Sequence, residues 1–226
     1  MRYIATILTL LASYTAAAPP KLEYRATNLP AASQVTIESI NYAGSGCPSG
    51  SVAGTFSDDR TLVTLAFDTY VAQSGSSIAP KENRKACQLT LKMHFPGGWQ
   101  YVSNHHILHF WTRSLILSLR FSIFKADYRG YVSLPAKAKS FCSSTYYFSG
   151  ADQTSQVARS KWFTGPIAGQ SYYKSDEVGL DSTVWSPCGQ EGMLNIKSEI
   201  GILPGGSTAA SVMTVSDTRV YTPTLQ

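Results

Sequence analysis

Charged residues are scarce in this sequence, and their scarcity excludes several classes of protein. Asp, Glu, Lys and Arg make up 15% of the 226 residues, whereas about a quarter of an average globular chain is charged. A chain this poor in charge and 43% hydrophobic is neither disordered through charge nor a coiled coil. The formal net charge is +5, but Arg2, Arg113 and Arg120 fall in two segments that we exclude from the fold below. The remaining excess of positive charge is too small to predict nucleic-acid binding.

Several motifs that carry chemistry are also absent. The sequence has no G-x-S-x-G nucleophile elbow, no C-x-x-C pair and no N-x-S/T glycosylation site. Outside residues 101–120 its one histidine is His94, which we expect to lie exposed on the polar side of a strand. We therefore predict no catalytic triad, no metal site and no cofactor. Acidic residues on or near predicted strands leave open a glycosidase or lyase that uses paired carboxylates; they are Asp58, Asp59, Asp68, Asp127, Glu191 and Glu199.

No apolar run is long enough to span a bilayer. Ile4–Leu11 is apolar, follows Arg2 and precedes small residues, a pattern typical of a secretory signal peptide. We predict that residues 1–17 are this peptide, cleaved after Ala17. Residues 18–34, with three prolines and little periodicity, are predicted to be an N-terminal arm. The mature protein is then secreted and extracellular, with no membrane span.

Secretion decides how the four cysteines are interpreted. An even number of widely spaced cysteines in an oxidising compartment predicts two disulfides. The residues are Cys47, Cys87, Cys142 and Cys188. Four cysteines allow three connectivities, and the sequence alone does not choose among them. We favour Cys47–Cys87 with Cys142–Cys188, because the other pairings enclose longer loops.

Turn-forming residues and tyrosines are abundant, with 17 Gly, 11 Pro and 13 Tyr. Strict alternation of apolar and polar residues predicts half-buried strands at 87–95 and 194–202. Further strands are expected at 35–42, 51–56, 62–71, 121–132, 142–149 and 211–221. Many short strands with turn signals between them, and no helical pattern, predict an all-β fold. We expect an antiparallel β-sandwich or jelly-roll-like single domain over residues 35–226.

Residues 101–120 do not resemble the rest of the chain. They contain no Gly, Pro, Asp or Glu, and they hold three of the four histidines. We interpret them as a translated intron: codons for Gln100 to Val102 can contain a splice donor, and Leu119-Arg120 can supply an acceptor. Removing these twenty codons keeps the frame and joins Trp99-Gln100 to Phe121 in one alternating strand. An ordinary loop insertion, a membrane-seeking helix and a His105/His106/His109 metal site are the alternatives.

Four short motifs follow one another along the chain: Gly46-Cys47-Pro48, Cys87-Gln-Leu-Thr-Leu, Lys125-Ala-Asp-Tyr-Arg-Gly130 and Ser186-Pro-Cys-Gly189. Their order resembles that in the domain of unknown function family 4360, small secreted proteins of fungi and some bacteria. The resemblance covers about residues 35–222, apart from the predicted intron. It implies a secreted four-cysteine domain and implies no activity, because none is established for the family.

Aromatic residues supply the predicted binding site. Trp162, Tyr172 and Tyr173 lie in a polar stretch near Gly165, Pro166 and Gly169, where exposed rings could stack on sugars. We therefore expect a non-enzymatic extracellular binding or structural module, acting on a carbohydrate, a cell wall or a host surface. An extracellular hydrolase or lyase that uses carboxylates on a polysaccharide is the alternative.

Overall fold

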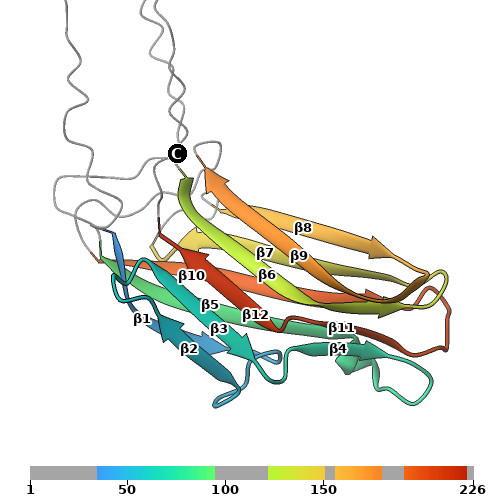
Figure 1. Cartoon of the computed structure of the whole chain (residues 1–226). Coiled ribbons are helices and arrows are strands. Elements are labelled where there is room, and N and C mark those ends of the chain that lie inside the picture. Colours follow the sequence, from blue (N-terminus) through green and yellow to red (C-terminus); the bar gives the residue numbers. More distant parts are fainter. Residues whose placement is uncertain (1–34, 95–121, 151–155, 180–190, 223–226) are drawn as a thin grey trace, which may run out of the picture.

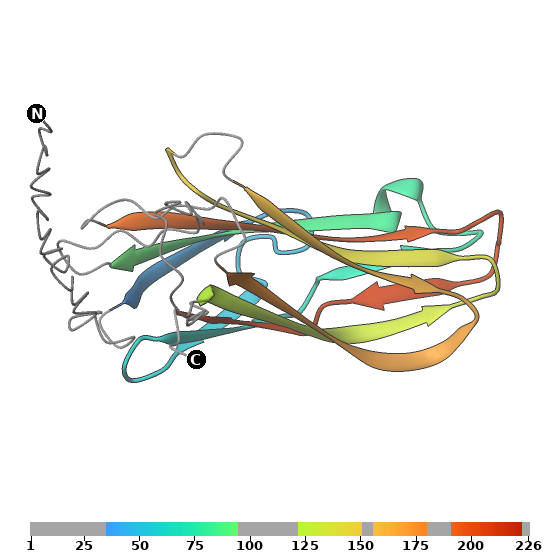
Figure 2. The same ribbon diagram turned by 90° about the horizontal axis from the view of Figure 1, so that it is seen from above.

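The computed structural model describes residues 35–94, 122–150, 156–179 and 191–222, which form two antiparallel sheets packed face to face (Figures 1 and 2). The all-β sandwich predicted from the sequence is confirmed. Sheet A has the strand order β1-β5-β10-β7-β8. Its strands are β1 (Thr36–Ala43), β5 (Arg84–His94), β10 (Gly192–Leu203), β7 (Lys139–Phe148) and β8 (Val157–Thr164).

Sheet B has the order β2-β3-β12-β6-β11-β4, and β9 pairs with the free side of β6. Its strands are β2 (Val52–Phe56), β3 (Leu62–Phe67), β4 (Val71–Ser74), β6 (Ser122–Leu134), β9 (Ile167–Gly179), β11 (Ser211–Thr214) and β12 (Asp217–Tyr221). A single 3₁₀ turn, η2 (Pro80–Asn83), is the one helical element of the described residues. No helix in the described ranges is long and apolar enough to cross a membrane.

The two alternating strands predicted with the clearest pattern supply the centre of the core. In β5, Cys87, Leu89 and Leu91 are fully buried, and in β10 Leu194 and Ile196 are buried opposite them. Side chains alternate across a strand, so the intervening residues face solvent on the outer side of sheet A. Removing this apolar surface from water is the main stabilising contribution of the sandwich.

The structure differs from the predicted strands in two ways. The segments expected at 62–71 and 211–221 are each interrupted, and between the resulting strands Val215 donates its N–H to the carbonyl of Tyr70 (3.0 Å) outside the regular ladder. Strands β8 and β9 were not predicted at all. These two strands form the edges of their sheets and lie next to each other (Figure 1).

One of the two predicted disulfides is present. Cys47 and Cys87 are bonded, and both are buried. The second predicted disulfide, Cys142–Cys188, is not seen and stays a prediction: Cys142 is a free and buried thiol. It points into the sandwich from β7, where burial raises its pKa to about 11. Cys188 lies outside the described residues, as do the signal peptide, the N-terminal arm and the segment 101–120.

Candidate functional site

A groove of about 510 Å³ crosses the outer face of sheet A. Strand register places one residue from each of four neighbouring strands in a single row, in the order Trp162 (β8), Phe141 (β7), Gly201 (β10) and Arg84 (β5). Because neighbouring strands lie about 4.8 Å apart, this row extends about 14 Å across the sheet. The full lining is Asn83, Arg84, Phe141, Ser143, Ser160, Trp162, Glu199, Gly201, Ile202 and Leu203.

Two aromatic rings form one end of the groove. Trp162 is 58% exposed, which is unusual for the largest apolar side chain. Its ring lies 5.0 Å from that of Phe141, with 42° between the planes. A Cβ atom at position 201 would lie 2.5 Å from Cε1 of Phe141, so the ring of Phe141 occupies the space over Gly201. The result is an apolar shelf that faces solvent.

An ion pair forms the other end of the groove. The Nε of Arg84 donates to Oε1 of Glu199, and this hydrogen bond raises the pKa of Arg84 above its ordinary value. The guanidinium also lies 5.9 Å from the centroid of the Phe141 ring. Arg84 is largely exposed, and its bond to Glu199 uses one of the five N–H donors of the guanidinium.

This combination can hold a ligand that has both an apolar face and hydroxyl groups. The rings offer flat apolar contact, while Arg84 donates and Glu199 and the hydroxyls of Ser143 and Ser160 accept hydrogen bonds. Small-molecule sites usually pair an apolar lining with a few placed polar groups in this way. A sugar ring presents those two kinds of surface.

The three aromatic residues predicted to bind a ligand are not brought together. Trp162 lies in the groove. Tyr172 is only 6% exposed; its ring packs 5.0 Å from that of Phe163, and its hydroxyl donates to the carbonyl of Thr214. Tyr173 is exposed, but on the outer face of sheet B. Adjacent residues of a strand face opposite sides, so Tyr172 and Tyr173 never shared a surface.

Phe141, Gly201 and Arg84 were not identified from the sequence. They come from three strands that are distant along the chain and meet only through sheet register. One sequence signal was available for Gly201, because a glycine inside a strongly alternating strand often marks a close approach by another group.

The acidic residues proposed for a carboxylate mechanism lie apart. Asp59 accepts hydrogen bonds from Ser57 and Thr61 in the turn before β3, and these bonds lower its pKa. Asp127 is buried on the outer side of sheet B beside Lys125, 3.6 Å away. Among the described residues, Glu199 is the one carboxylate that lines the groove. The paired arrangement that glycoside hydrolysis uses is therefore not formed there.

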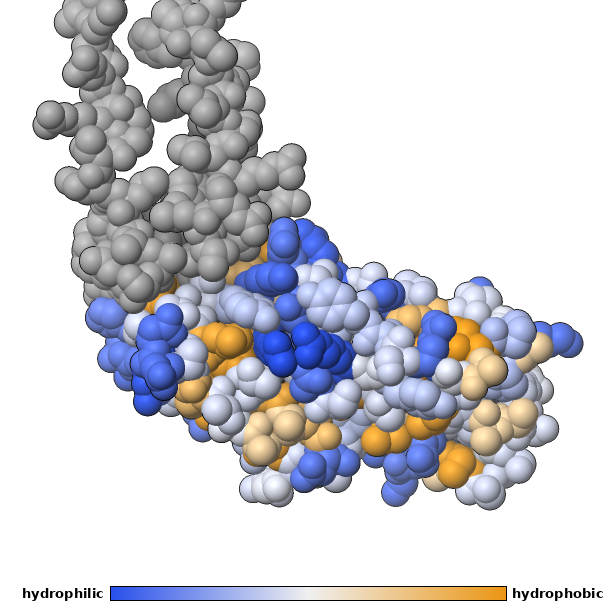
Figure 3. Space-filling view, viewed as in Figure 1, coloured by the Kyte–Doolittle hydropathy of each residue, from blue (hydrophilic) through white to orange (hydrophobic). Residues whose placement is uncertain are grey.

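The outer face of sheet B has a different character. Figure 3 shows a compact hydrophilic area over the middle of β6 and β12. Register brings charged residues of these two strands into neighbouring positions there: Lys125, Asp127, Arg129, Asp217 and Arg219. Apolar residues on this face are scattered rather than gathered into one patch.

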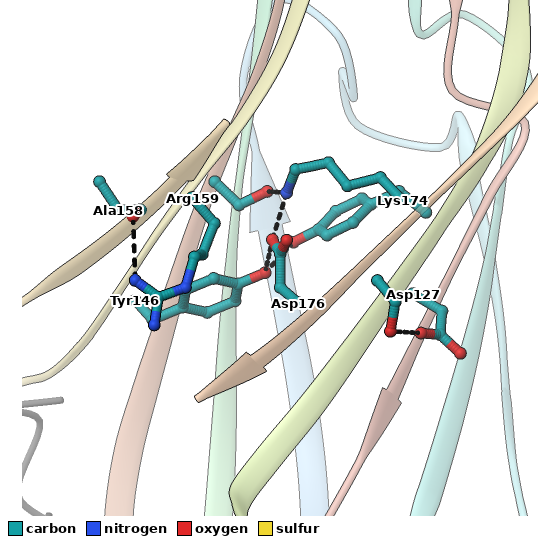
Figure 4. A network of polar contacts seen from close by, with 9 residues as sticks. Asp127, Tyr146, Ala158, Arg159, Lys174 and Asp176 are labelled. Carbon is teal, nitrogen blue, oxygen red and sulfur yellow. Dashed lines mark hydrogen bonds and ion pairs between the residues drawn. The ribbon is translucent and has the colours of Figure 1, made fainter. Parts of the chain in front are cut away.

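A buried polar cluster lies between the sheets on the β7–β9 side of the sandwich (Figure 4). Lys174 and Asp176 project inward from β9 and form an ion pair, each only 4% exposed. Lys174 also donates to Oγ of Ser144 (3.0 Å), and the hydroxyl of Tyr146 donates to Asp176 (2.6 Å). These bonds satisfy charges that would otherwise be costly to bury.

The described residues contain no group of three or more His, Cys, Asp or Glu side chains arranged to hold a metal ion. The histidines of the predicted 101–120 segment lie outside these residues.

Comparisons with known proteins identify relatives without an assigned activity. The family described as "Domain of unknown function (DUF4360)" matches residues 33–109 and 117–224. The break between these matches falls inside the predicted intron, although the match also includes parts of it, so the intron stays a prediction. An "Uncharacterized secreted protein" of Arthroderma benhamiae is 41% identical over 187 residues, which is 83% of this chain and 67% of the relative.

Among solved structures, TmCBM61 in complex with β-1,4-galactotriose is similar at 7% identity. The similarity covers 83% of this chain and 90% of that one, with a TM-score of 0.31, too low to carry an argument. The secreted relative and the Cys47–Cys87 disulfide confirm the predicted extracellular location.

Proposed function

The chain belongs to the DUF4360 family, and from that premise we propose that it is a non-enzymatic extracellular module that binds a carbohydrate chain in the groove of sheet A. The observation that carries this proposal is the exposed ring of Trp162 beside Phe141, in one row with Arg84 across four strands. The two rings form one exposed apolar surface with polar groups at its border, and such a surface often marks a ligand-binding groove.

The groove is suited to binding rather than to bond cleavage. The sheet backbone fixes the positions of Phe141 and Trp162, so little conformational freedom is lost when a ligand binds. Stacking and hydrogen bonds in the groove recognise a sugar but provide no paired acid and base. A long ligand can extend beyond the row, because the groove is open along the sheet.

Binding to insoluble chitin, β-glucan, cellulose and galacturonan tests the proposal. We expect wild-type protein to be retained by at least one of them and Trp162→Ala to bind at least tenfold more weakly. A tenfold loss corresponds to about 1.4 kcal/mol, within the range for truncating an aromatic anchor.

The matched control is Tyr131→Ala, which removes an exposed aromatic residue of β6 from the other sheet. It should leave retention unchanged. Retention by none of the four polysaccharides, or an equal loss in both variants, would rule out the proposed groove.

A further inference from the structure

Another row of side chains crosses the outer face of sheet A, parallel to the row that forms the groove. Strand register places one residue from each of four neighbouring strands in it, in the order Tyr147 (β7), Asn195 (β10), Thr90 (β5) and Asn41 (β1). We call it the distal row. Phe141 and Tyr147 lie six residues apart on β7, and a strand rises about 3.4 Å per residue, so the two rows are about 20 Å apart.

The distal row offers an aromatic ring and fixed polar groups. Tyr147 is partly exposed and faces the same side as Phe141, because residues an even number apart on a strand share a face. The hydroxyl of Thr90 donates to Oδ1 of Asn195 (2.9 Å), and Nδ2 of Asn195 donates to Oγ of Ser149 (2.7 Å). These bonds hold the buried Asn195 in one orientation, so little freedom is lost there when a ligand binds.

An open concavity of about 390 Å³ lies at the β5–β1 end of the distal row. Gln88 lines it and is exposed; its Nε2 lies 3.4 Å from the hydroxyl of Tyr147 and 3.5 Å from Oδ1 of Asn195. The ring and the concavity therefore belong to one site, which we call the distal subsite. Its amide and hydroxyl groups can both donate hydrogen bonds to a sugar and accept them. The lining of the concavity is Asn41, Tyr42, Ala43, Gly44, Gln88 and Thr90.

No aromatic side chain separates the groove from the distal subsite on the described part of this face. Between the two rows, register gives one row of Ala86, Glu199, Ser143 and Ser160 and another of Gln88, Lys197, Thr145 and Ala158. These side chains are small, hydroxylated or flexible, and Glu199 and Lys197 carry opposite charges two residues apart on β10. A chain molecule that lies on Phe141 can therefore continue along β7, which runs beside β10 in the sheet (Figure 1).

We propose that the groove and the distal subsite bind one extended polysaccharide chain, which lies along β7 with one sugar on Trp162 and Phe141 and a later sugar on Tyr147. This inference rests on the proposed function and adds the length and the course of the bound chain. Gln88 would bind hydroxyl groups of the distal sugar. Because both ends belong to one ligand, the second contact is intramolecular, and affinity increases with chain length until both subsites are filled.

Oligosaccharides of increasing length test this proposal. Titration calorimetry would measure oligomers of chitin, β-glucan, cellulose and galacturonan with two to eight sugars each. In at least one series we expect the affinity to rise about tenfold or more with length and then to level off. Oligomers too short to extend about 20 Å along the strands should bind through the groove alone.

Variants of the distal subsite should affect only the long oligomers. Tyr147→Ala and Gln88→Ala should each remove most of the gain with length and leave the affinity for the shortest bound oligomer unchanged. That unchanged affinity also shows that the variants are folded. Tyr147→Phe, which keeps the ring, should keep most of the gain. Trp162→Ala should weaken binding at every length.

Matched controls lie on sheet B. Tyr131→Ala and Gln73→Ala remove an exposed ring from β6 and an exposed amide from β4, and they should change binding at no length. Wild-type affinity that does not depend on length, or a gain that persists in Tyr147→Ala and Gln88→Ala, would overturn the inference and leave the groove in place. Loss of the gain in the controls would overturn it as well. Failure of Trp162→Ala to weaken any oligomer would overturn the proposed function itself.

Discussion

At the scale of single residues, Gly201 matters because of what it lacks. Neighbouring strands of a sheet lie about 4.8 Å apart. A ring on one strand can therefore extend over the next strand only where that strand carries no outward side chain. Phe141 does so over Gly201. The shape of the groove therefore depends on a residue that makes no side-chain contact with any ligand.

Replacing Gly201 by Ala should weaken carbohydrate binding about tenfold with little loss of stability. The new methyl group would lie 2.5 Å from Cε1 of Phe141, so the ring must turn out of the groove. Alanine is favoured over glycine in a strand by about 0.5–1 kcal/mol, which offsets part of the crowding. Calorimetry and urea unfolding measure the two effects.

The matched control for this substitution is Gly54→Ala, on β2 of the other sheet, where the nearest side-chain atom to a new Cβ is Cδ2 of Leu65, 3.3 Å away. It should leave binding unaltered. If Gly201→Ala bound carbohydrate as well as wild-type protein, Phe141 would have no part in the site.

At the scale of elements, β8 and β9 show where sequence patterns fail. The inward positions of β9 include Lys174 and Asp176, so the alternation of apolar and polar residues that marks other strands is absent. Of the four buried positions of β9 from 172 to 178, only the first and the last, Tyr172 and Val178, are apolar. Strands β8 and β9 therefore could not be found from hydrophobicity, whereas β5 and β10, with apolar inward faces, were predicted.

The disulfide Cys47–Cys87 connects the segment after β1 to β5 across a sequence separation of 40 residues. A loop of this length predicts a stabilisation of about 4 kcal/mol through the entropy of the unfolded chain. We expect Cys47→Ala/Cys87→Ala to lower the free energy of unfolding by about this amount, measured by urea denaturation.

Alkylation of denatured, unreduced protein followed by peptide mass analysis gives the companion measurement. The peptide that contains Cys142 should be labelled, while those with Cys47 and Cys87 should not. A Cys142 that resisted labelling before reduction would restore the second disulfide that the sequence predicted.

At the scale of the whole molecule, stability should fall at alkaline pH. Burial raises the pKa of Cys142 to about 11 and raises those of Tyr70, Tyr128 and Tyr146 well above their ordinary value. The unfolded chain releases these protons first, from about pH 9 for the thiol and pH 10 for the phenols. Their contribution is therefore complete below about pH 9 and is lost as the pH rises further.

Urea midpoints between pH 7 and pH 11 would measure this decline. Cys142→Ala should remove the part that begins near pH 9 and retain the part that follows the tyrosines. A midpoint that stayed constant up to pH 11 would contradict the protonation states assigned to the interior.

The sequence alone predicted the class of fold and the part of the core that β5 and β10 supply, because the alternation of apolar and polar residues places Leu89, Leu91, Leu194 and Ile196 on buried faces. Of the groove it singled out Trp162 as a binding residue and Glu199 as a carboxylate. The pairing of β7 with β8 sets Phe141 beside Trp162, and the pairings of β10 with β7 and β5 bring Arg84 into the same row. Local patterns do not encode which strands pair or in which register.

Apolar surface is unevenly distributed in the interior of the sandwich, and this affects which strands separate first when the native protein unfolds locally. Separating β5 from β10 exposes leucines and isoleucines, whereas separating β8 and β9 from the rest exposes Ser144, Lys174 and Asp176, which water solvates well. Local opening costs less where less apolar surface is uncovered. Amide hydrogens of β8 and β9 should therefore exchange with solvent deuterium long before those of β5 and β10, and a ligand bound in the groove should slow that exchange in β8.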